Sequence, residues 1–173
     1  VMEVSSHSLD MHRVDDIKYN TAIFTNLSQD HLDFHKDMDK YYCAKEKLFK
    51  MLDYKSHAII NIDDKIADRL IDTCKSKIIT YGFSAAADIR VLNTQYSIDS
   101  TSSTISAFGK GYGVSTKLIG EFNLYNVIAS IASLSKIIPI EKIIKSITSL
   151  SRDKTVIMVA HRNSTLKNCN KIY

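Results

Sequence analysis

Short apolar runs of strand length alternate along this chain with segments in which apolar residues recur at helical spacing. Four apolar runs are suited to strands: residues 1–4, 21–27, 57–62 and 77–83. Between the last two runs, apolar residues recur on one helical face and predict a helix over 63–75, with the face Ile66, Leu70, Ile71 and Cys74. Such alternation predicts an α/β fold built on a mostly parallel sheet flanked by helices.

The second half of the chain has a different residue composition and a different apolar pattern. Residues 88–116 are rich in serine and threonine, alternate in part and contain three glycines, which predicts antiparallel strands and turns added to the parallel core. Two helices are predicted next, over 121–137 and over 139–150, and Pro139 suits the first position of the second one. A last apolar run, residues 155–161, predicts a final strand.

A helix is also predicted over 37–52, and its most unusual member is Lys45. Apolar residues at helical spacing surround this lysine, namely Tyr41, Leu48, Phe49 and Leu52. One interpretation is a lysine that lays its stem over the edge of the core and keeps its charge in water. The other is chemical: burial disfavours a charged amine, and a neutral amine can react with carbon dioxide to give a carbamate, which behaves as a carboxylate.

Two further polar positions are candidates for a cation or phosphate site. Glu3 lies within an apolar run, where a carboxylate is costly unless it is paired or holds a cation, although an edge strand with Glu3 facing water is equally compatible with the pattern. His31 follows a predicted strand, so it is expected where α/β sheets bind ligands, at the carboxyl ends of their strands. His31 and His35 have helical spacing, but the glutamate of zinc-protease helices is absent after His31.

Composition and charge narrow the classes of function. The 173 residues, 45% of them hydrophobic, suffice for one domain with a proper core. All of the net charge of +4 comes from residues 151–173, so no basic patch within the fold favours nucleic-acid binding. No run approaches the roughly 18 apolar residues of a membrane span. The three cysteines lack disulfide or zinc spacing, and a cytoplasmic protein with reduced thiols is therefore expected.

Four segments, in order and at consistent spacing, carry a resemblance to a known family. They are MEVSSHSLDMHRVD at 2–15, FTNLSQDHLDFH at 24–35, YYCAKEKLF at 41–49 and GEFNLYNVIASIASL at 120–134. Through these segments, residues 1–150 resemble the central ATP-binding domain of the Mur ligases. The resemblance implies a P-loop-NTPase-like α/β sheet, truncated at its amino terminus, with a small antiparallel addition.

The resemblance also implies a reaction and a metal site. Within the family, the chain is most similar to the enzymes that add the third amino acid to UDP-N-acetylmuramoyl-L-alanyl-D-glutamate in peptidoglycan synthesis. Such an enzyme passes the γ-phosphate of ATP to a substrate carboxylate, and the amine of the incoming amino acid attacks the acyl phosphate to form an amide. Glu3 and His31 match magnesium-binding positions. Lys45 matches the lysine that is carbamylated in the family and that helps to hold a second magnesium ion.

Other matched positions are expected to contact the substrates. Ser5 and Arg13 match positions that contact the peptide part of the nucleotide-sugar substrate, while Asn123 and Asn126 match positions close to the adenine of ATP. The amino acid is expected to be diaminopimelate or lysine. The family's glycine-rich phosphate loop belongs before Glu3, and its other two domains lie outside residues 1–150. We therefore do not expect this chain to catalyse the reaction by itself.

The last residues carry a second resemblance. Residues 151–173 are similar to the carboxyl-terminal end of an ABC transporter ATPase domain, in which His161 matches the switch histidine that approaches the γ-phosphate. This resemblance predicts a junction near residues 146–152 between two unrelated pieces.

Three functions remain open at this point: a fragment of an amide-forming ligase, a fragment of a transporter ATPase, or a non-catalytic remnant that binds a partner. A sheet without the strand and helix of the phosphate loop is expected to leave an apolar edge or face uncovered.

Overall fold

The computed structural model describes residues 1–27 and 35–150, and in this part of the chain a six-stranded sheet runs in the order β1 to β6. The strands are β1 (Thr21–Phe24), β2 (His57–Asn61), β3 (Lys77–Gly82), β4 (Ile89–Tyr96), β5 (Thr101–Ala107) and β6 (Lys110–Thr116). Neighbours from β1 to β4 are parallel, whereas β5 and β6 are added antiparallel. The predicted parallel sheet with an antiparallel addition is confirmed.

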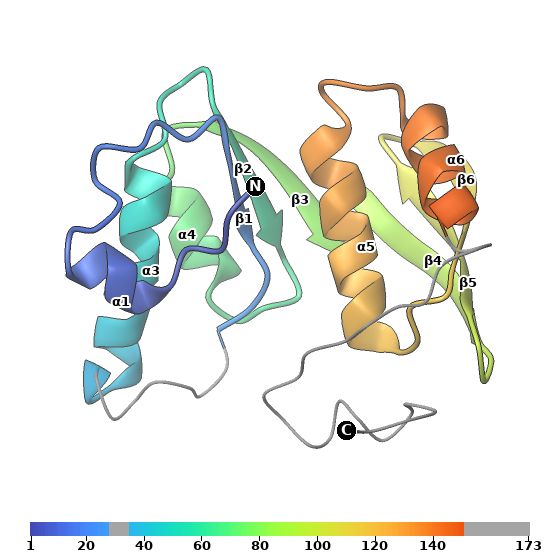
Figure 1. Ribbon diagram of the computed structural model, residues 1–173, viewed down its shortest axis with the longest axis horizontal. Helices are drawn as coiled ribbons and strands as arrows, with labels where there is room; N and C mark the ends of the chain where they lie inside the picture. The colour runs from blue at the N-terminus through green and yellow to red at the C-terminus, as the bar shows by residue number, and fades with distance from the viewer. Residues whose placement is uncertain (28–34, 151–173) are drawn as a thin grey trace.

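Helices cover both faces of this sheet (Figure 1). They are α3 (Met38–Lys50), α4 (Ala67–Thr73), α5 (Glu121–Leu134) and α6 (Ile140–Leu150), and the short helix α1 (Ser6–Asp10) packs on α3. Helices α3 and α4 pack on one face, because each connects two parallel strands that follow one another in the same direction across the sheet. Helix α5 covers the opposite face, and α6 packs against it and against β6.

The central strand β2 shows why its apolar run is nearly continuous. Ala58 and Ile60 point to the core beneath α3 and α4, while Ile59 between them points to the core beneath α5 and α6. All three are completely buried. A parallel strand between two helical layers needs apolar side chains on both faces, so the run in the sequence is the direct cause of the three-layer arrangement.

Two parts of the pattern fold differently from the prediction. Residues 1–4 were expected to form a strand, but they precede α1 without regular structure, and Val1, Met2 and Glu3 are exposed. A short apolar run forms a strand only where a neighbouring strand pairs with it, and no described strand does so here. The helix expected over 63–75 begins only at Ala67, because the Asp64 side chain accepts a bond from the N–H of Ile66 and forms a local turn, while the Asp63 side chain bonds to the distant N–H of Ser84.

The carboxyl ends of the parallel strands are held together by these two aspartates. The Asp63 carboxylate accepts bonds from the backbone N–H groups of Phe83 and Ser84, which follow β3, and from the hydroxyl of Tyr125 on α5 at 2.8 Å. The Asp64 carboxylate accepts a bond of 2.8 Å from the N–H of Leu27, which follows β1. The segments after β1 and β3, together with α5, are thereby bonded to the end of β2.

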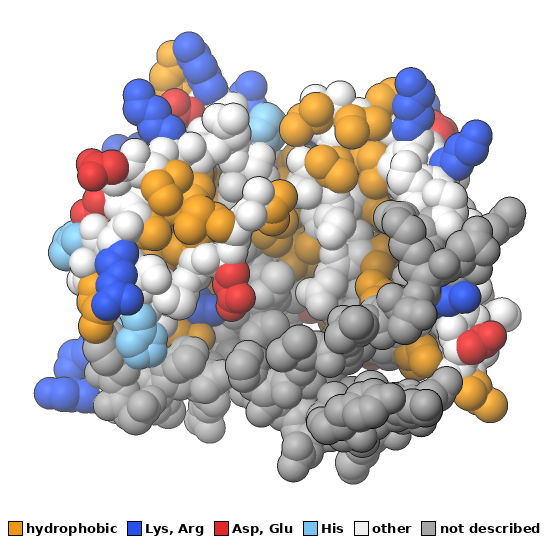
Figure 2. Space-filling model, in the orientation of Figure 1, with side chains coloured by type: hydrophobic (Ala, Val, Ile, Leu, Met, Phe, Trp, Pro, Cys, Tyr) orange, Lys and Arg blue, Asp and Glu red, His pale blue; other side chains and the backbone are white. Residues whose placement is uncertain are grey.

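Part of the apolar surface stays in contact with solvent. On β1, an edge of the described sheet, Ile23 is 39% exposed on the face that α5 covers elsewhere. Figure 2 shows apolar side chains over the connection from α5 to α6, where Leu134, Ile137 and Ile138 are exposed. Ile23 is thus partly uncovered at the sheet edge, whereas Leu134, Ile137 and Ile138 lie outside the sheet. That a phosphate-loop strand and helix would cover such an edge stays a prediction. None of the described helices has the length and apolar character needed to cross a membrane.

Gly82 offers a test of the aspartate contacts. It has a φ of +154°, and a Cβ atom at this position would lie 2.5 Å from Oδ2 of Asp63. We expect Gly82→Ala to displace the Asp63 carboxylate from its donors and to lower the free energy of unfolding by about 2 kcal/mol. Urea denaturation measures this difference.

The matched control is Gly111→Ala, because a Cβ at Gly111 meets nothing within 4 Å. This control is expected to change the free energy of unfolding by less than about 0.5 kcal/mol. Equal effects of the two substitutions would show that the Asp63 contact at Gly82 carries no stability.

Candidate functional site

Lys45 lies in the middle of α3 on its buried side. The helix begins after Asp37, whose side chain accepts a bond of 2.8 Å from the N–H of Lys40, and it packs on the sheet through Tyr42 and Phe49. Lys45 is half-buried, and its Nζ lies 5.1 Å from the centroid of the Tyr41 ring. The predicted place of Lys45 on the apolar stripe is confirmed, and the ammonium group meets the face of an aromatic ring at the edge of the core.

A buried histidine lies next to that ring. His35 is 3% exposed and stacks on Tyr41 with ring centroids 5.2 Å apart and an interplanar angle of 22°. Its Nε2 lies 2.8 Å from Oγ of Ser6, and its Nδ1 lies 3.4 Å from Oδ2 of Asp10. With the ring proton on Nδ1, facing the carboxylate, the Ser6 hydroxyl donates to Nε2. Sequence patterns gave no signal for these contacts, since they join residues that are far apart along the chain.

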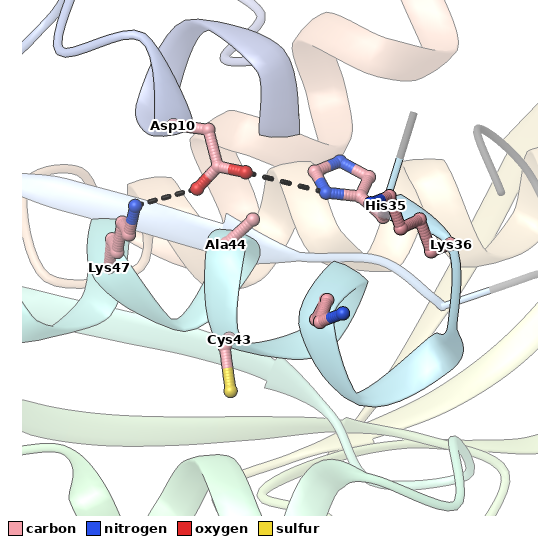
Figure 3. Close-up of a pocket in the computed structure, with 7 residues that line it drawn as sticks. Asp10, His35, Lys36, Cys43, Ala44 and Lys47 are labelled. Atoms are coloured by element: carbon pink, nitrogen blue, oxygen red, sulfur yellow. Dashed lines mark hydrogen bonds and ion pairs between the residues drawn. The ribbon is translucent and has the colours of Figure 1, made fainter. Parts of the chain in front are cut away.

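Helix α1 is held against α3 by this group of side chains (Figure 3). The second oxygen of Asp10 accepts a bond of 2.6 Å from Nζ of Lys47, so one carboxylate bridges His35 and α3. A pocket of about 340 Å³ opens beside these contacts. Its lining residues are Asp10, His35, Lys36, Lys40, Cys43, Ala44 and Lys47.

The residues predicted to bind the peptide part of the substrate flank α1. Ser5 caps the helix, because its Oγ accepts a bond of 3.1 Å from the N–H of Ser8. Arg13 follows the helix with an exposed side chain, and its own N–H donates to the carbonyl of Ser8. Glu3 precedes the helix and is exposed, and the described contacts do not join it to Lys45. The short helix α1 was missed in the sequence, although serine is among the residues preferred at the position just before a helix.

The two asparagines predicted to lie near adenine are in the first turns of α5. Asn123 donates a bond of 2.8 Å from Nδ2 to the carbonyl of Ile119, and Asn126 is exposed. Tyr125, between them, holds this end of the helix to the Asp63 carboxylate. Burial, together with that hydrogen bond, raises the pKa of Tyr125, so its hydroxyl stays a donor at neutral pH. The asparagines therefore lie at the carboxyl edge of the sheet, where α/β folds bind ligands.

The predicted metal ligands differ in the chemical form in which each could bind a metal ion. Within the described ranges, no three or more His, Cys, Asp or Glu side chains are grouped as a metal site. Glu3 is an exposed carboxylate, and oxygen ligands of this kind suit Mg²⁺. The Lys45 ammonium has no lone pair for a metal, so Lys45 could be a metal ligand only as a carbamate. His31, the third predicted ligand, lies outside the described residues, as does His161 in the tail.

The comparisons with known proteins decide the family. Residues 1–134 match the family model described as the Mur ligase middle domain. This chain belongs to the Mur ligase family. Its segments around Glu3, His31, Lys45 and Asn123 all fall within the matched range. The predicted resemblance of residues 1–150 is thereby confirmed, whereas the resemblance of residues 151–173 to a transporter ATPase finds no support.

Two similar relatives carry the name of one branch of the Mur ligases. The chain is 44% identical over 131 residues to the UDP-N-acetylmuramoyl-L-alanyl-D-glutamate–2,6-diaminopimelate ligase of Caldanaerobacter subterraneus, covering 76% of this chain and 27% of that protein. It is 39% identical over 158 residues to the ligase of the same name from Bacillus cereus, covering 87% and 32%. The chain thus spans about a third or less of the length of these relatives.

Solved Mur ligase structures share the fold. A UDP-N-acetylmuramoyl-L-alanyl-D-glutamate–2,6-diaminopimelate ligase matches with a TM-score of 0.78 and 28% identity, over 93% of this chain and 34% of the other. A MurF ligase from Thermotoga maritima in complex with ADP matches with a TM-score of 0.65 at 16% identity, over 88% and 34%. The second match supports the α/β architecture alone.

Glu46 provides a pH test of α3, the helix that carries Lys45. Burial alone would raise the pKa of the Glu46 carboxyl, but bonds from Lys50 and Tyr42 outweigh it and hold the pKa below the ordinary value of 4.5. Because the folded pKa is lowered, this stabilisation is present above pH 4.5 and is lost as the pH falls through the folded value. Glu46→Gln should lower the free energy of unfolding by about 1 kcal/mol at neutral pH and by less near pH 3.

Urea denaturation at both pH values checks this expectation. The control is Asp72→Asn, which changes an exposed carboxylate on α4 and should have little effect at either pH. A loss of stability for Glu46→Gln that is the same at both pH values would contradict the assignment of the stabilisation to the ionised carboxylate.

Proposed function

We propose that this chain is the central segment of an ATP-dependent ligase that joins diaminopimelate to UDP-N-acetylmuramoyl-L-alanyl-D-glutamate. The observation that carries the proposal is the match of residues 1–134 to the Mur ligase middle domain, together with relatives of 39–44% identity that bear this ligase name. Diaminopimelate is favoured over lysine by the names of those relatives. A reaction that consumes ATP to make a cell-wall precursor places the protein in the cytoplasm.

In this proposal, the phosphoryl-transfer side of the site is formed by Glu3, His31 and Lys45. Lys45 reacts as the neutral amine: its nitrogen bonds to the carbon of CO₂, one proton is released, and the product is a carbamate anion. The half-buried position over the Tyr41 ring separates this amine from bulk water on one side. The exposed Glu3 carboxylate and the carbamate are oxygen ligands for Mg²⁺, which would neutralise charge on the phosphoryl group when bound.

The substrate side is formed by the residues that flank α1. Ser5 and Arg13 lie at the two ends of this helix, one a hydroxyl and the other a guanidinium that suits a carboxylate of the peptide. The reaction proceeds when a carboxylate oxygen of the dipeptide takes the γ-phosphoryl group from ATP. The amine of diaminopimelate then attacks the acyl carbon, and phosphate leaves. Holding both reactants in line supplies most of the catalysis in such a transfer.

The nucleotide side is assigned to the first turns of α5. Asn123 and Asn126 would contact the adenine, and the bond from Tyr125 to Asp63 would keep them at the carboxyl edge of the sheet. One amide N–H of Asn123 donates a hydrogen bond to the carbonyl of Ile119. This bond orients the side chain and leaves the amide oxygen available to a ligand. This placement is supported by the general position of ligands in parallel α/β sheets.

A chimera tests the function of this segment within a complete ligase. Residues 1–134 replace the matching residues of the Caldanaerobacter subterraneus ligase, and release of ADP is measured with the nucleotide-sugar dipeptide and diaminopimelate. The proposal predicts an active chimera in which Lys45→Gln lowers kcat at least about 100-fold, because the amide cannot supply the negative charge of a carbamate.

Lys55→Gln is the matched control in the same chimera. Lys55 also lies over a tyrosine ring, with Nζ at 5.5 Å from the Tyr54 centroid, but it is exposed outside α3. Its loss should change kcat by less than about twofold. A folded chimera without activity, or one in which Lys45→Gln is as active as its parent, would refute the proposal.

A further inference from the structure

The proposed site leaves one buried polar side chain without a role. His35 is 3% exposed, directly precedes the turn into α3 and contacts both α1 and α3. It also lies beside His7 of α1, with ring centroids 5.5 Å apart. A side chain of this size buries a polar ring only at a cost, unless both nitrogens find partners. Through its contact partners, His35 is connected to the candidate site.

One partner lies next to a predicted substrate residue. Ser6 is 2% exposed, and its Oγ is 2.8 Å from Nε2 of His35. Ser5, which caps α1 and is predicted to contact the peptide, is its neighbour in sequence. Asp10, at the other end of α1, lies 3.4 Å from Nδ1. The two nitrogens of one imidazole therefore fix the first and last turns of this five-residue helix.

The other contact of His35 leads to Lys45. The imidazole stacks on Tyr41 at 5.2 Å, Tyr41 is 4% exposed, and the Lys45 amine lies 5.1 Å from the Tyr41 centroid. Tyr41 and Lys45 are one helical turn apart, so the position of the ring limits where the amine can lie. Contact with His35 limits the rotation of the Tyr41 ring, and the Lys45 amine lies against this ring.

We propose that His35 is a positioning residue of the ligase site, which sets the Lys45 amine relative to the Ser5 end of α1. The two imidazole nitrogens contact Ser6 and Asp10 of α1, and the face of the ring stacks on Tyr41 of α3. One side chain therefore fixes two segments that are distant in sequence. An apolar residue could fill the same volume, but it could not hold α1 by directed bonds. The role of Lys45 rests on the proposed function, whereas the placement itself can be measured in this chain alone.

The experiment follows Lys45 by NMR in the full chain, with ¹³C-labelled lysine and with ¹³C-bicarbonate in the buffer. The resonances of the Lys45 side chain carry a ring-current shift from Tyr41, and a carbamate gives its own ¹³C signal, which Lys45→Gln assigns by its loss. His35→Asn should move the Lys45 resonances toward those of free lysine and lower the carbamate fraction about fivefold. It should also shift the amide resonances of Ser5 and Ser8.

Two further variants separate the contacts of His35. His35→Phe keeps a ring for stacking but removes both nitrogens, so the Lys45 resonances should change little while those of Ser5 and Ser8 shift. Ser6→Ala removes one bond with little risk to folding and should reproduce the change at Ser5. If His35→Asn does not fold, unshifted Ser5 resonances in both of these variants would overturn the proposal. The matched control is His12→Asn, at an exposed histidine bonded to Asp15 in the same segment, where Asn tolerates the φ of 57°.

The outcomes separate this inference from the proposed function. Variants of His35 that lower the melting temperature but leave the Lys45 and Ser5 resonances and the carbamate fraction unchanged would overturn it, because His35 would then be structural alone. A parent chain without any carbamate signal would count against the role proposed for Lys45. In that case a displaced Lys45 resonance in His35→Asn would still support the positioning by His35, and an undisplaced one would overturn it.

Discussion

Two adjacent carboxylates after β2 hold the functional edge of this protein together. Asp63 binds the segment after β3 and the hydroxyl of Tyr125 on α5, and Asp64 binds the N–H of Leu27 after β1. Parallel strands bring their carboxyl ends to one edge, but the loops that leave this edge have no ladder partners of their own. The carboxylates supply those partners. The first turns of α5, with their two asparagines, owe their position to these bonds.

The candidate site has a second organising centre on the other face of the sheet. There the polar contacts of His35 and Asp10 join α1 to α3, and the stack of His35 on Tyr41 connects them to Lys45. The central sheet separates these contacts from α5, so the residues proposed for the nucleotide and those proposed for the peptide belong to different layers. Under the proposed function, a phosphoryl group would pass at the carboxyl edge while each reactant is bound by its own helix. Rigid placement of two reactants is the main requirement of this transfer.

Much of the fold was predictable from the sequence, because each parallel strand and each flanking helix has its own local pattern. The boundaries of α3, α5 and α6 follow apolar spacing closely, and the place of Lys45 on the stripe of α3 follows from the same rule. Residues 1–4 were wrongly predicted as a strand, since pairing with a neighbour is not visible in a four-residue run. The contacts of His35 and Asp63 were also missed, because they depend on long-range packing rather than on periodicity. The family resemblance supplied the candidate ligands that patterns alone left open.

The central claim of the proposal is that a carbamylated Lys45 helps to hold one divalent cation and that Glu3 holds another. Mn²⁺ prefers the same oxygen ligands as Mg²⁺ and broadens the NMR signals of nearby amides, so a titration of the ¹⁵N-labelled chain in bicarbonate buffer tests this claim most directly. The account predicts that the amides of Glu3, Ser5 and Lys45 broaden first and that Lys45→Gln abolishes the broadening around Lys45 while that of Glu3 remains. Broadening that begins instead at exposed acidic positions such as Asp15 and Asp72, and that does not change in Lys45→Gln, would contradict it.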